Sequence, residues 1–121
     1  MKILLTGASS FTGYWFAQTL AAAGHELVAP LRGNLDSPHD AERSQRLRRL
    51  RDKVELVPAC GFGSAKFLGI ADSHDFDVLC HHGAEVGDYR NPEFDIARAA
   101  ASNTLNLRSV LGAMSGRGVK G

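Results

Sequence analysis

The sequence has 121 residues, of which 44% are hydrophobic and 22% are charged, and its formal net charge at pH 7 is +1. This length and composition predict one globular domain with a core of its own, and the near-neutral charge gives no indication of nucleic-acid binding. The sequence has no run of about 20 apolar residues, so it predicts no membrane-spanning helix. The N-terminus has no features of a secretory signal, and two cysteines are too few for a disulfide framework, so we expect a cytoplasmic protein.

The N-terminal part of the chain has the pattern of a strand, a helix and a second strand. An apolar run at residues 3–5 predicts the first strand, residues 13–23 predict a helix, and residues 26–31 predict the second strand. The predicted apolar stripe of the helix consists of Phe11, Trp15 and Leu20. This compact spacing is typical of a βαβ unit with parallel strands.

The segment that connects the first strand to the first helix, Thr6 to Gly13, consists mostly of small residues between two glycines. In such a turn the backbone can approach a ligand closely, and the free N–H groups and positive dipole end of the helix attract an anion. The loop therefore predicts a phosphate site. A dinucleotide fingerprint has a third glycine between these two, and Ser10 stands near that position. The alternative is a tight strand-to-helix turn that binds no ligand.

The middle of the chain continues the alternation of helices and strands. Ser37-Pro38 predicts the start of a helix that reaches about residue 51, and a short strand is expected at residues 54–58. Ser64 is expected to cap a short helix that ends near residue 70. We interpret the arginines of the first of these helices as a solvent-exposed basic face, with a phosphate-attracting flank of the site as the alternative. They are Arg43, Arg46, Arg48, Arg49 and Arg51.

The C-terminal part predicts one more strand and a long helix. Residues 76–81 have the apolar middle of a buried parallel strand, and Asn91-Pro92 opens a helix that reaches about residue 114. The whole pattern predicts an α/β fold, a doubly wound parallel sheet of about four strands in the order 3-2-1-4. Ligands bind such sheets beyond the carboxyl ends of the strands, where the first and fourth strands lie side by side. This places residues 7–13 and 81–85 on opposite sides of one crevice.

Two of these segments resemble a known family. Residues 6–13, TGASSFTG, resemble the T-G-x-x-G-x-x-G loop of the extended short-chain dehydrogenase/reductases, the NAD-dependent epimerase/dehydratase family. Residues 76–84, FDVLCHHGA, are similar to the D-x-V-x-H-x-A-A element of that family's fourth strand. Asn91-Pro92 and the helix bearing residues 104–107 resemble the segment that follows. The resemblance covers nearly the whole chain and implies a Rossmann-like dinucleotide-binding domain.

The resemblance also implies which residues contact a nicotinamide dinucleotide. The residues expected to hold its pyrophosphate are Gly7, Ser9, Ser10, Phe11 and Gly13. Those expected on the far wall of the crevice are His81, Gly83 and Ala84, while His82 packs or faces solvent. Arg32 is expected to meet the adenosine ribose or its phosphate. Because no carboxylate stands at the end of the second strand, NADP is favoured, with NAD as the alternative. The sequence departs from the family at Ser10, Cys60-Gly61, Ala100 and Asn103.

Members of the resembled family transfer a hydride on a small-molecule substrate, commonly a nucleotide sugar, and use a Tyr-x-x-x-Lys pair for acid–base chemistry. This pair is missing, since Tyr14 is followed four residues later by Gln18 and Tyr89 by Glu93. We therefore expect no catalytic residue in this chain. We interpret it as the N-terminal domain of a longer oxidoreductase, truncated before a fifth strand that residues 119–121 begin, with the substrate bound by the missing C-terminal half.

Other functions remain open as hypotheses. A non-catalytic nucleotide-sensing or interaction module accounts for Ser10 and for the missing Tyr-x-x-x-Lys pair, whereas a flavodoxin-like mononucleotide binder fits the fourth-strand element less well. A metal site at Cys80-His81-His82 is not expected, because consecutive strand residues point to opposite faces. An apolar fourth strand at the edge of the sheet predicts self-association through that edge.

Overall fold

The computed structural model describes residues 1–87 and 90–116, which contain one four-stranded parallel sheet in the order β3-β2-β1-β4. The predicted fold class and strand order are confirmed. The strands are β1 (Lys2–Thr6), β2 (Glu26–Pro30), β3 (Glu55–Val57) and β4 (Val78–His81). The helices are α1 (Phe11–Ala22), α2 (Ala41–Leu50), α3 (Ala65–Ser73), α4 (Ile96–Asn103) and α5 (Leu107–Ser115). Residues 119–121, where a fifth strand is expected to begin, lie outside the described residues.

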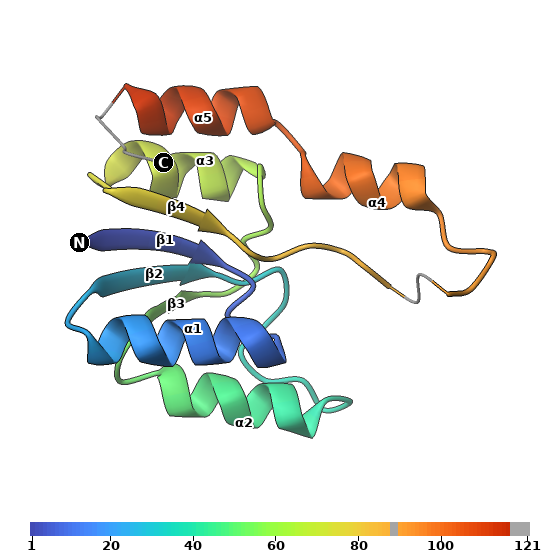
Figure 1. Cartoon of the computed structure of the whole chain (residues 1–121), viewed down its shortest axis with the longest axis horizontal. Helices are drawn as coiled ribbons and strands as arrows, with labels where there is room; N and C mark the ends of the chain where they lie inside the picture. The colour runs from blue at the N-terminus through green and yellow to red at the C-terminus, as the bar shows by residue number, and fades with distance from the viewer. Residues whose placement is uncertain (88–89, 117–121) are drawn as a thin grey trace.

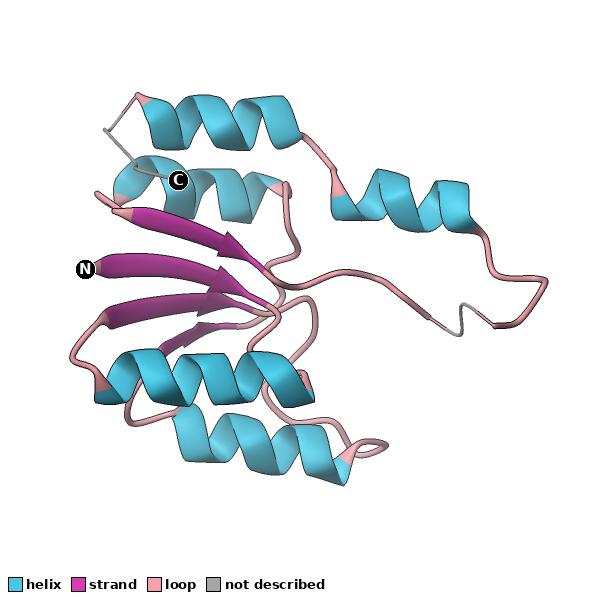
Figure 2. Cartoon of the chain, in the orientation of Figure 1, coloured by secondary structure: helices cyan, strands magenta, loops and turns pink. Residues whose placement is uncertain are grey.

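Helices cover both faces of the sheet (Figure 1), and Figure 2 shows the strands as the central layer between them. α1 and α2 lie on one face, α3 and α5 lie on the other, and α4 extends beyond the carboxyl ends of the strands. Successive strand residues point to opposite faces, so β1 contributes to both cores. Ile3 and Leu5 pack with Ala17 of α1, whereas Leu4 packs with Phe67 of α3.

The face that α1 turns toward the sheet differs from the predicted apolar stripe. Gly13, Tyr14 and Ala17 are buried, whereas Phe11 and Trp15 are 69% and 53% exposed. The prediction that Phe11 and Trp15 face the core is therefore wrong, although Leu20 does pack against it. The close approach is at Gly13, where a Cβ would lie 2.0 Å from the Gly7 carbonyl oxygen, so this position must face the loop after β1.

Helices α2 and α4 both begin a few residues later than the sequence predicts. Asp40 and Asp95 are their N-caps, and each carboxylate accepts from the N–H three residues on, at 2.8 and 2.9 Å. Ser37 and Asn91, the expected caps, lie in the turns before these helices. The carboxylate of an aspartate cap accepts a hydrogen bond from a helix N–H, and its negative charge is attracted to the positive end of the helix dipole. Ser64 caps α3 as predicted, accepting from the Phe67 N–H at 3.2 Å.

The long C-terminal helix that the sequence predicts is interrupted between α4 and α5. Asn106 there has a left-handed φ of 52°, and its side-chain amide donates to the Gly63 carbonyl oxygen at 2.8 Å. The adjoining Leu105 carbonyl oxygen is so close to Gly63 that a Cβ on this glycine would lie 1.8 Å from it. Contact with the loop before α3 thus outweighs the local preference for one continuous helix.

β4 forms one edge of the sheet, since within the described part of the chain it pairs with β1 alone. Val78, Leu79 and Cys80 are half-buried, so β4 is less buried than its apolar sequence predicts. The uncovered outer edge explains this difference. None of the described helices has the length and apolar composition that crossing a membrane requires.

Candidate functional site

Ser10 closes the loop between β1 and α1. Its N–H and its hydroxyl both donate to the Gly7 carbonyl oxygen, at 3.1 and 2.9 Å, and its Oγ accepts from the Gly13 N–H at 3.0 Å. Ser10 is thereby the N-cap of α1, with a φ of −72° that any residue can adopt. A serine near the position of the fingerprint's middle glycine is therefore accommodated without backbone strain. The N–H groups of Phe11 and Thr12 have no hydrogen-bond acceptor among the described residues.

Glycines bring the ends of β1 and β4 into backbone contact. Gly7 has a φ of 82°, and a Cβ on it would lie 2.7 Å from the Gly83 Cα. A Cβ on Gly83 would lie 2.8 Å from the Gly7 nitrogen. Gly13 is confined as well, because its Cβ would lie 2.0 Å from the Gly7 carbonyl oxygen. These positions accept no side chain, and together they hold two loop backbones against each other at the base of the crevice.

A chain of hydrogen bonds joins these loops to α4. The Gly83 N–H donates to Thr6 Oγ1 at 2.8 Å, and this oxygen lies 2.8 Å from His81 Nδ1. His81 Nε2 lies 3.0 Å from the Asn103 carbonyl oxygen. Since a carbonyl only accepts, we assign the proton to Nε2, and in the neutral ring Nδ1 accepts from the Thr6 hydroxyl. The His81 ring also stacks on Phe62, with ring centroids 3.9 Å apart.

We expect Thr6→Val to lower the free energy of unfolding by about 2 kcal/mol. Thr6 is 5% exposed, and valine keeps its branched shape but leaves the Gly83 N–H and His81 Nδ1 without their partner. Urea denaturation followed by circular dichroism measures the loss. Thr6→Ser retains the hydroxyl and serves as the matched control, with an expected loss below about 1 kcal/mol. Equal losses in the two variants would show that the hydroxyl is not what stabilises this contact.

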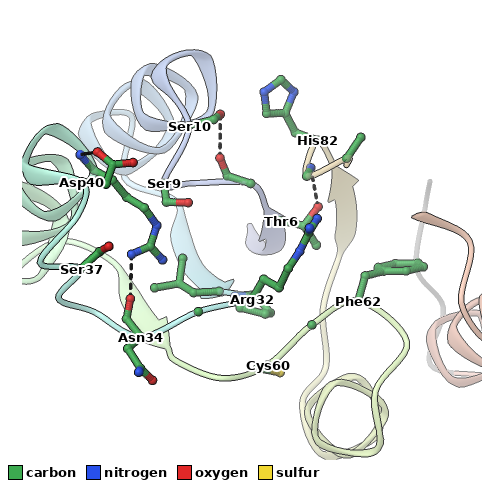
Figure 3. A pocket seen from close by; sticks show the side chains of 18 of the residues that line it. Thr6, Ser9, Ser10, Arg32, Asn34, Ser37, Asp40, Cys60, Phe62 and His82 are labelled. Atoms are coloured by element: carbon green, nitrogen blue, oxygen red, sulfur yellow. Dashed lines mark hydrogen bonds between the residues drawn. The ribbon is translucent and has the colours of Figure 1, made fainter. Parts of the chain in front are cut away.

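A cleft of about 830 Å³ opens beside these loops at the carboxyl ends of the strands (Figure 3). Its volume is in the range of small-molecule and cofactor pockets. Of the residues that the sequence predicts to contact a dinucleotide, those that line the cleft are Gly7, Ser9, Ser10, Arg32, Gly83 and Ala84. Those that do not line it are Phe11, Gly13 and His81. Phe11 is the first residue of α1, and its backbone N–H has no acceptor in the helix. Gly13 lets α1 lie close to the Gly7 carbonyl oxygen.

His81 does not line the cleft as expected, whereas His82 packs as expected and also lines the cleft. His82 lines the cleft, and its ring lies edge-on to Phe16 of α1 with ring centroids 5.2 Å apart. His81 ends β4 beside Thr6 and belongs to a separate apolar groove with Phe62 and α5. His81 is the last residue of β4 and His82 follows it, and their rings contact different partners, Phe62 and Phe16. The sequence does not show which of the two rings adjoins the cleft.

Two arginines of α2 belong to the site. Arg43 lines the cleft, and its Nη1 donates to the Asn34 carbonyl oxygen at 2.8 Å (Figure 3). Arg46 donates from Nε to the carbonyl oxygen of Ser9 at 2.9 Å and so ties α2 to the loop that follows β1. A flank of positive charge therefore stands beside the cleft, as in the alternative interpretation of this helix.

The remaining arginines of α2 fit the solvent-exposed interpretation, since Arg48 and Arg49 are exposed. The spacing of Arg43 and Arg46 in the sequence nevertheless indicates that these two arginines face the sheet. Residues 43 and 46 share a helical stripe with the buried Leu47 and Leu50, because positions i, i+3, i+4 and i+7 lie on one face. An arginine on the apolar stripe of a helix is expected to meet a partner near the sheet.

Cys60 follows β3 and lines the cleft with 1% of its surface exposed. Burial raises the pKa of its thiol from the ordinary value of 9.0, an effect that the Lys66 charge and a hydrogen bond with Ser64 partly offset. The thiol is therefore protonated at neutral pH and is not poised as a nucleophile.

The described residues do not supply a substitute for the missing Tyr-x-x-x-Lys pair. Tyr14 is 4% exposed in the core beneath α1, and its hydroxyl accepts from Gln18 Nε2. Tyr89 lies outside the described residues. In residues 1–87 and 90–116, no group of three or more His, Cys, Asp and Glu side chains is arranged to hold a metal ion.

Comparison with known proteins gives one family and a set of related folds. A family model described as the NAD dependent epimerase/dehydratase family matches residues 3–121. No curated protein matches the chain. Among solved structures, the chain is similar to UDP-glucose 4-epimerase from Thermotoga maritima, determined with UDP-glucose, with a TM-score of 0.69 and 21% identity. The match covers 99% of this chain and 36% of that one.

Two further solved structures have the same fold. UDP-glucuronic acid 4-epimerase from Bacillus cereus, in complex with UDP-glucuronic acid and NAD, matches with a TM-score of 0.69 and 21% identity over 93% of this chain and 36% of that one. The bulky-bulky ketone specific alcohol dehydrogenase from Comamonas testosteroni matches with a TM-score of 0.61 and 23% identity over 96% and 49%. The chain therefore spans between 36% and 49% of the length of these proteins.

Proposed function

Because the chain belongs to the NAD dependent epimerase/dehydratase family, we propose that its cleft binds a nicotinamide dinucleotide as part of an oxidoreductase. The observation that carries the proposal is a cradle free of side chains beside the cleft. A Cβ on Gly7, Gly13 or Gly83 would lie between 2.0 and 2.8 Å from backbone atoms of Gly7 or Gly83. The first N–H groups and the positive dipole end of α1 lie at the same place. These features fit a pyrophosphate.

In this proposal the dinucleotide spans the cleft from β2 to β4. Its pyrophosphate contacts Gly7, Ser9, Ser10 and the backbone of Phe11, while Gly13 keeps α1 close. The adenosine ribose lies near Arg32. The nicotinamide end lies toward the wall made by His82, Gly83 and Ala84, which His81 supports from behind through Thr6.

The charges at the end of β2 favour NADP over NAD. Arg32 and Arg43 line this end of the cleft, and both can donate several hydrogen bonds to a 2′-phosphate. Asp36, which also lines the cleft, has a carboxylate oxygen 3.9 Å from Arg48 Nε. No carboxylate stands immediately after β2 to accept from a ribose 2′-hydroxyl.

We expect calorimetric titration to show tighter binding of NADPH than of NADH. Arg32→Ala is expected to weaken NADPH binding about tenfold, because a charge-assisted contact with the 2′-phosphate is lost, and to change NADH binding less than about threefold. Arg49→Ala is the matched control, since Arg49 is an exposed arginine of α2 outside the cleft lining, and it should leave both affinities unchanged. Failure of both dinucleotides to bind would contradict the proposal.

The activity of the longer protein is part of the same proposal. The dinucleotide supplies the group that accepts or donates a hydride, and this chain's residues bind and orient it. A segment beyond residues 1–121 binds the substrate and supplies the acid–base pair. The fold that the chain shares with two UDP-sugar epimerases supports a nucleotide sugar as the substrate. We assign no catalytic residue to this chain.

A non-catalytic nucleotide-sensing or interaction module is the second candidate, and the missing Tyr-x-x-x-Lys pair favours it. The intact mass of the protein isolated from its natural source distinguishes the two. A longer product with Tyr-x-x-x-Lys in its C-terminal part supports the oxidoreductase. A product that ends at Gly121 supports the module.

We also propose that two copies of this chain associate through the outer edge of β4. An unpaired strand edge offers N–H and C=O groups to another strand. Beside this edge lies an apolar groove of about 480 Å³ lined in part by Leu79, Leu107 and Leu111, of which Leu107 and Leu111 are 38% and 52% exposed. A second copy would cover both the edge and the groove.

A further inference from the structure

Glu85, four residues beyond β4, has its backbone fixed by the end of α4. The Glu85 N–H donates to Asn103 Oδ1 at 2.6 Å, and Asn103 Nδ2 donates to the Glu85 carbonyl oxygen at 3.2 Å. One carboxylate oxygen, Oε1, accepts from Arg98 Nη2 at 2.6 Å. Only 18% of this side chain is exposed. The carboxylate is therefore held at a constant place beside the cleft.

The second carboxylate oxygen of Glu85 faces the arginine that the proposed cofactor needs. Its Oε2 lies 3.7 Å from Arg32 Nη1, and the Arg32 side chain is 63% exposed. A single contact of this length neutralises charge without fixing the orientation of the guanidinium, unlike a bidentate pair. Arg32 is thus the partner that is free to turn, whereas Glu85 stays with Arg98.

We infer that Glu85 is a positioning residue that competes with a ligand's phosphate for Arg32 and so sets how strongly the site prefers a 2′-phosphorylated adenosine. This inference rests on the proposed function and deepens it. Glu85 itself does not line the cleft and acts through Arg32. A phosphate that binds Arg32 must draw it from Glu85, which lowers the gain from that contact. Removal of the Glu85 charge is therefore expected to strengthen binding of the phosphorylated ligand.

The experiment compares 2′,5′-ADP with 5′-AMP, which differ only in the 2′-phosphate, by calorimetric titration of the whole chain. Glu85→Gln keeps the side-chain size and an oxygen that can accept from Arg98. We expect it to tighten 2′,5′-ADP binding about threefold relative to 5′-AMP, the size of an exposed ion pair. In an Arg32→Ala background the same substitution should have no effect. Glu42→Gln is the matched control, because it removes an exposed negative charge outside the cleft lining that is paired with Arg46 instead of Arg32.

Each other outcome overturns the inference in a recognisable way. An unchanged ratio of the two affinities, with both ligands bound, overturns the role of Glu85 and leaves the proposed function intact. An equal effect of Glu42→Gln, or an effect that persists without Arg32, also overturns it. If neither Glu85→Gln nor the natural chain binds either ligand, both the inference and the proposed function fail. Should Glu85→Gln not fold, Glu85→Asp withdraws the carboxylate from Arg32 by one methylene, and an unchanged ratio there overturns the inference as well.

Discussion

Replacing Gly13 by alanine is expected to lower the free energy of unfolding by about 3 kcal/mol and to abolish dinucleotide binding. The added Cβ would lie 2.0 Å from the carbonyl oxygen of Gly7 and 2.9 Å from Ser10 Oγ. Neither neighbour can move without a loss of stability, because the Gly7 backbone is in contact with Gly83 and Ser10 is the N-cap of α1. The N-terminus of α1 must therefore move away from the loop that it forms with β1.

Urea denaturation and calorimetric titration with NADPH test this expectation. Gly69→Ala is the matched control, since Gly69 lies within α3 and nothing stands within 4 Å of the position of its Cβ. Alanine is the better helix former, so this variant is expected to gain about 0.5–1 kcal/mol and to keep its affinity for NADPH. A Gly13→Ala protein as stable as the natural chain would show that the two loops are not in the close contact described here.

The strand order could be predicted from the sequence because it depends on features that are local and repeated. Short apolar runs alternate with helical segments, and parallel strands with right-handed connections leave few arrangements. The positions of helix ends were less predictable. Ser37 and Asn91 each precede a proline, yet Asp40 and Asp95 cap the helices. Several residues in each turn can cap a helix, and tertiary contacts decide which of them does.

The interruption at Asn106 and the orientation of α1 required the tertiary structure. Asn106 leaves the helix to bind Gly63, which is distant in sequence and carries no apolar signal. Phe11 and Trp15 are large apolar residues, yet they are exposed, because the close approach of Gly13 fixes which face of α1 meets the loop. An apolar pattern indicates which side chains can bury apolar surface. It does not indicate where two backbone segments must lie in direct contact.

The residues of the site were predictable where backbone chemistry defines them and less so where side chains do. Gly7 and Gly83 follow from the requirement for close approach at the ends of adjacent strands. Which of His81 and His82 faces the cleft depends on the pairing of β4 with β1, and no spacing rule supplies it. Glu85 contacts Arg32, which lies far from it along the chain, and Arg98, which lies on α4, so its place beside the site depends on the tertiary structure.

Sedimentation equilibrium is expected to show that the chain of residues 1–121 forms dimers, and Leu111→Lys is expected to raise the dimer dissociation constant at least about tenfold. Leu111 is 52% exposed beside the edge of β4, and burial of a leucine contributes about 1.5–3 kcal/mol, which corresponds to a factor of ten or more. Lysine at this place forces a charge into the contact.

Ile96→Lys separates this effect from a general change of surface. Ile96 is an aliphatic residue of α4 that is 73% exposed and lies outside the groove, so its substitution should leave the dissociation constant unchanged. Equal effects of the two substitutions would place the contact elsewhere. A monomer over a wide range of concentrations would mean that the edge of β4 is protected within a single chain.

Dimer formation through this groove matters for the cofactor site, because Phe62 and His81 belong to the groove and Phe62 also lines the cleft. An occupant of the groove therefore touches the residues that support Thr6 and Gly83 from behind, and dimer formation is expected to stabilise the base of the cleft.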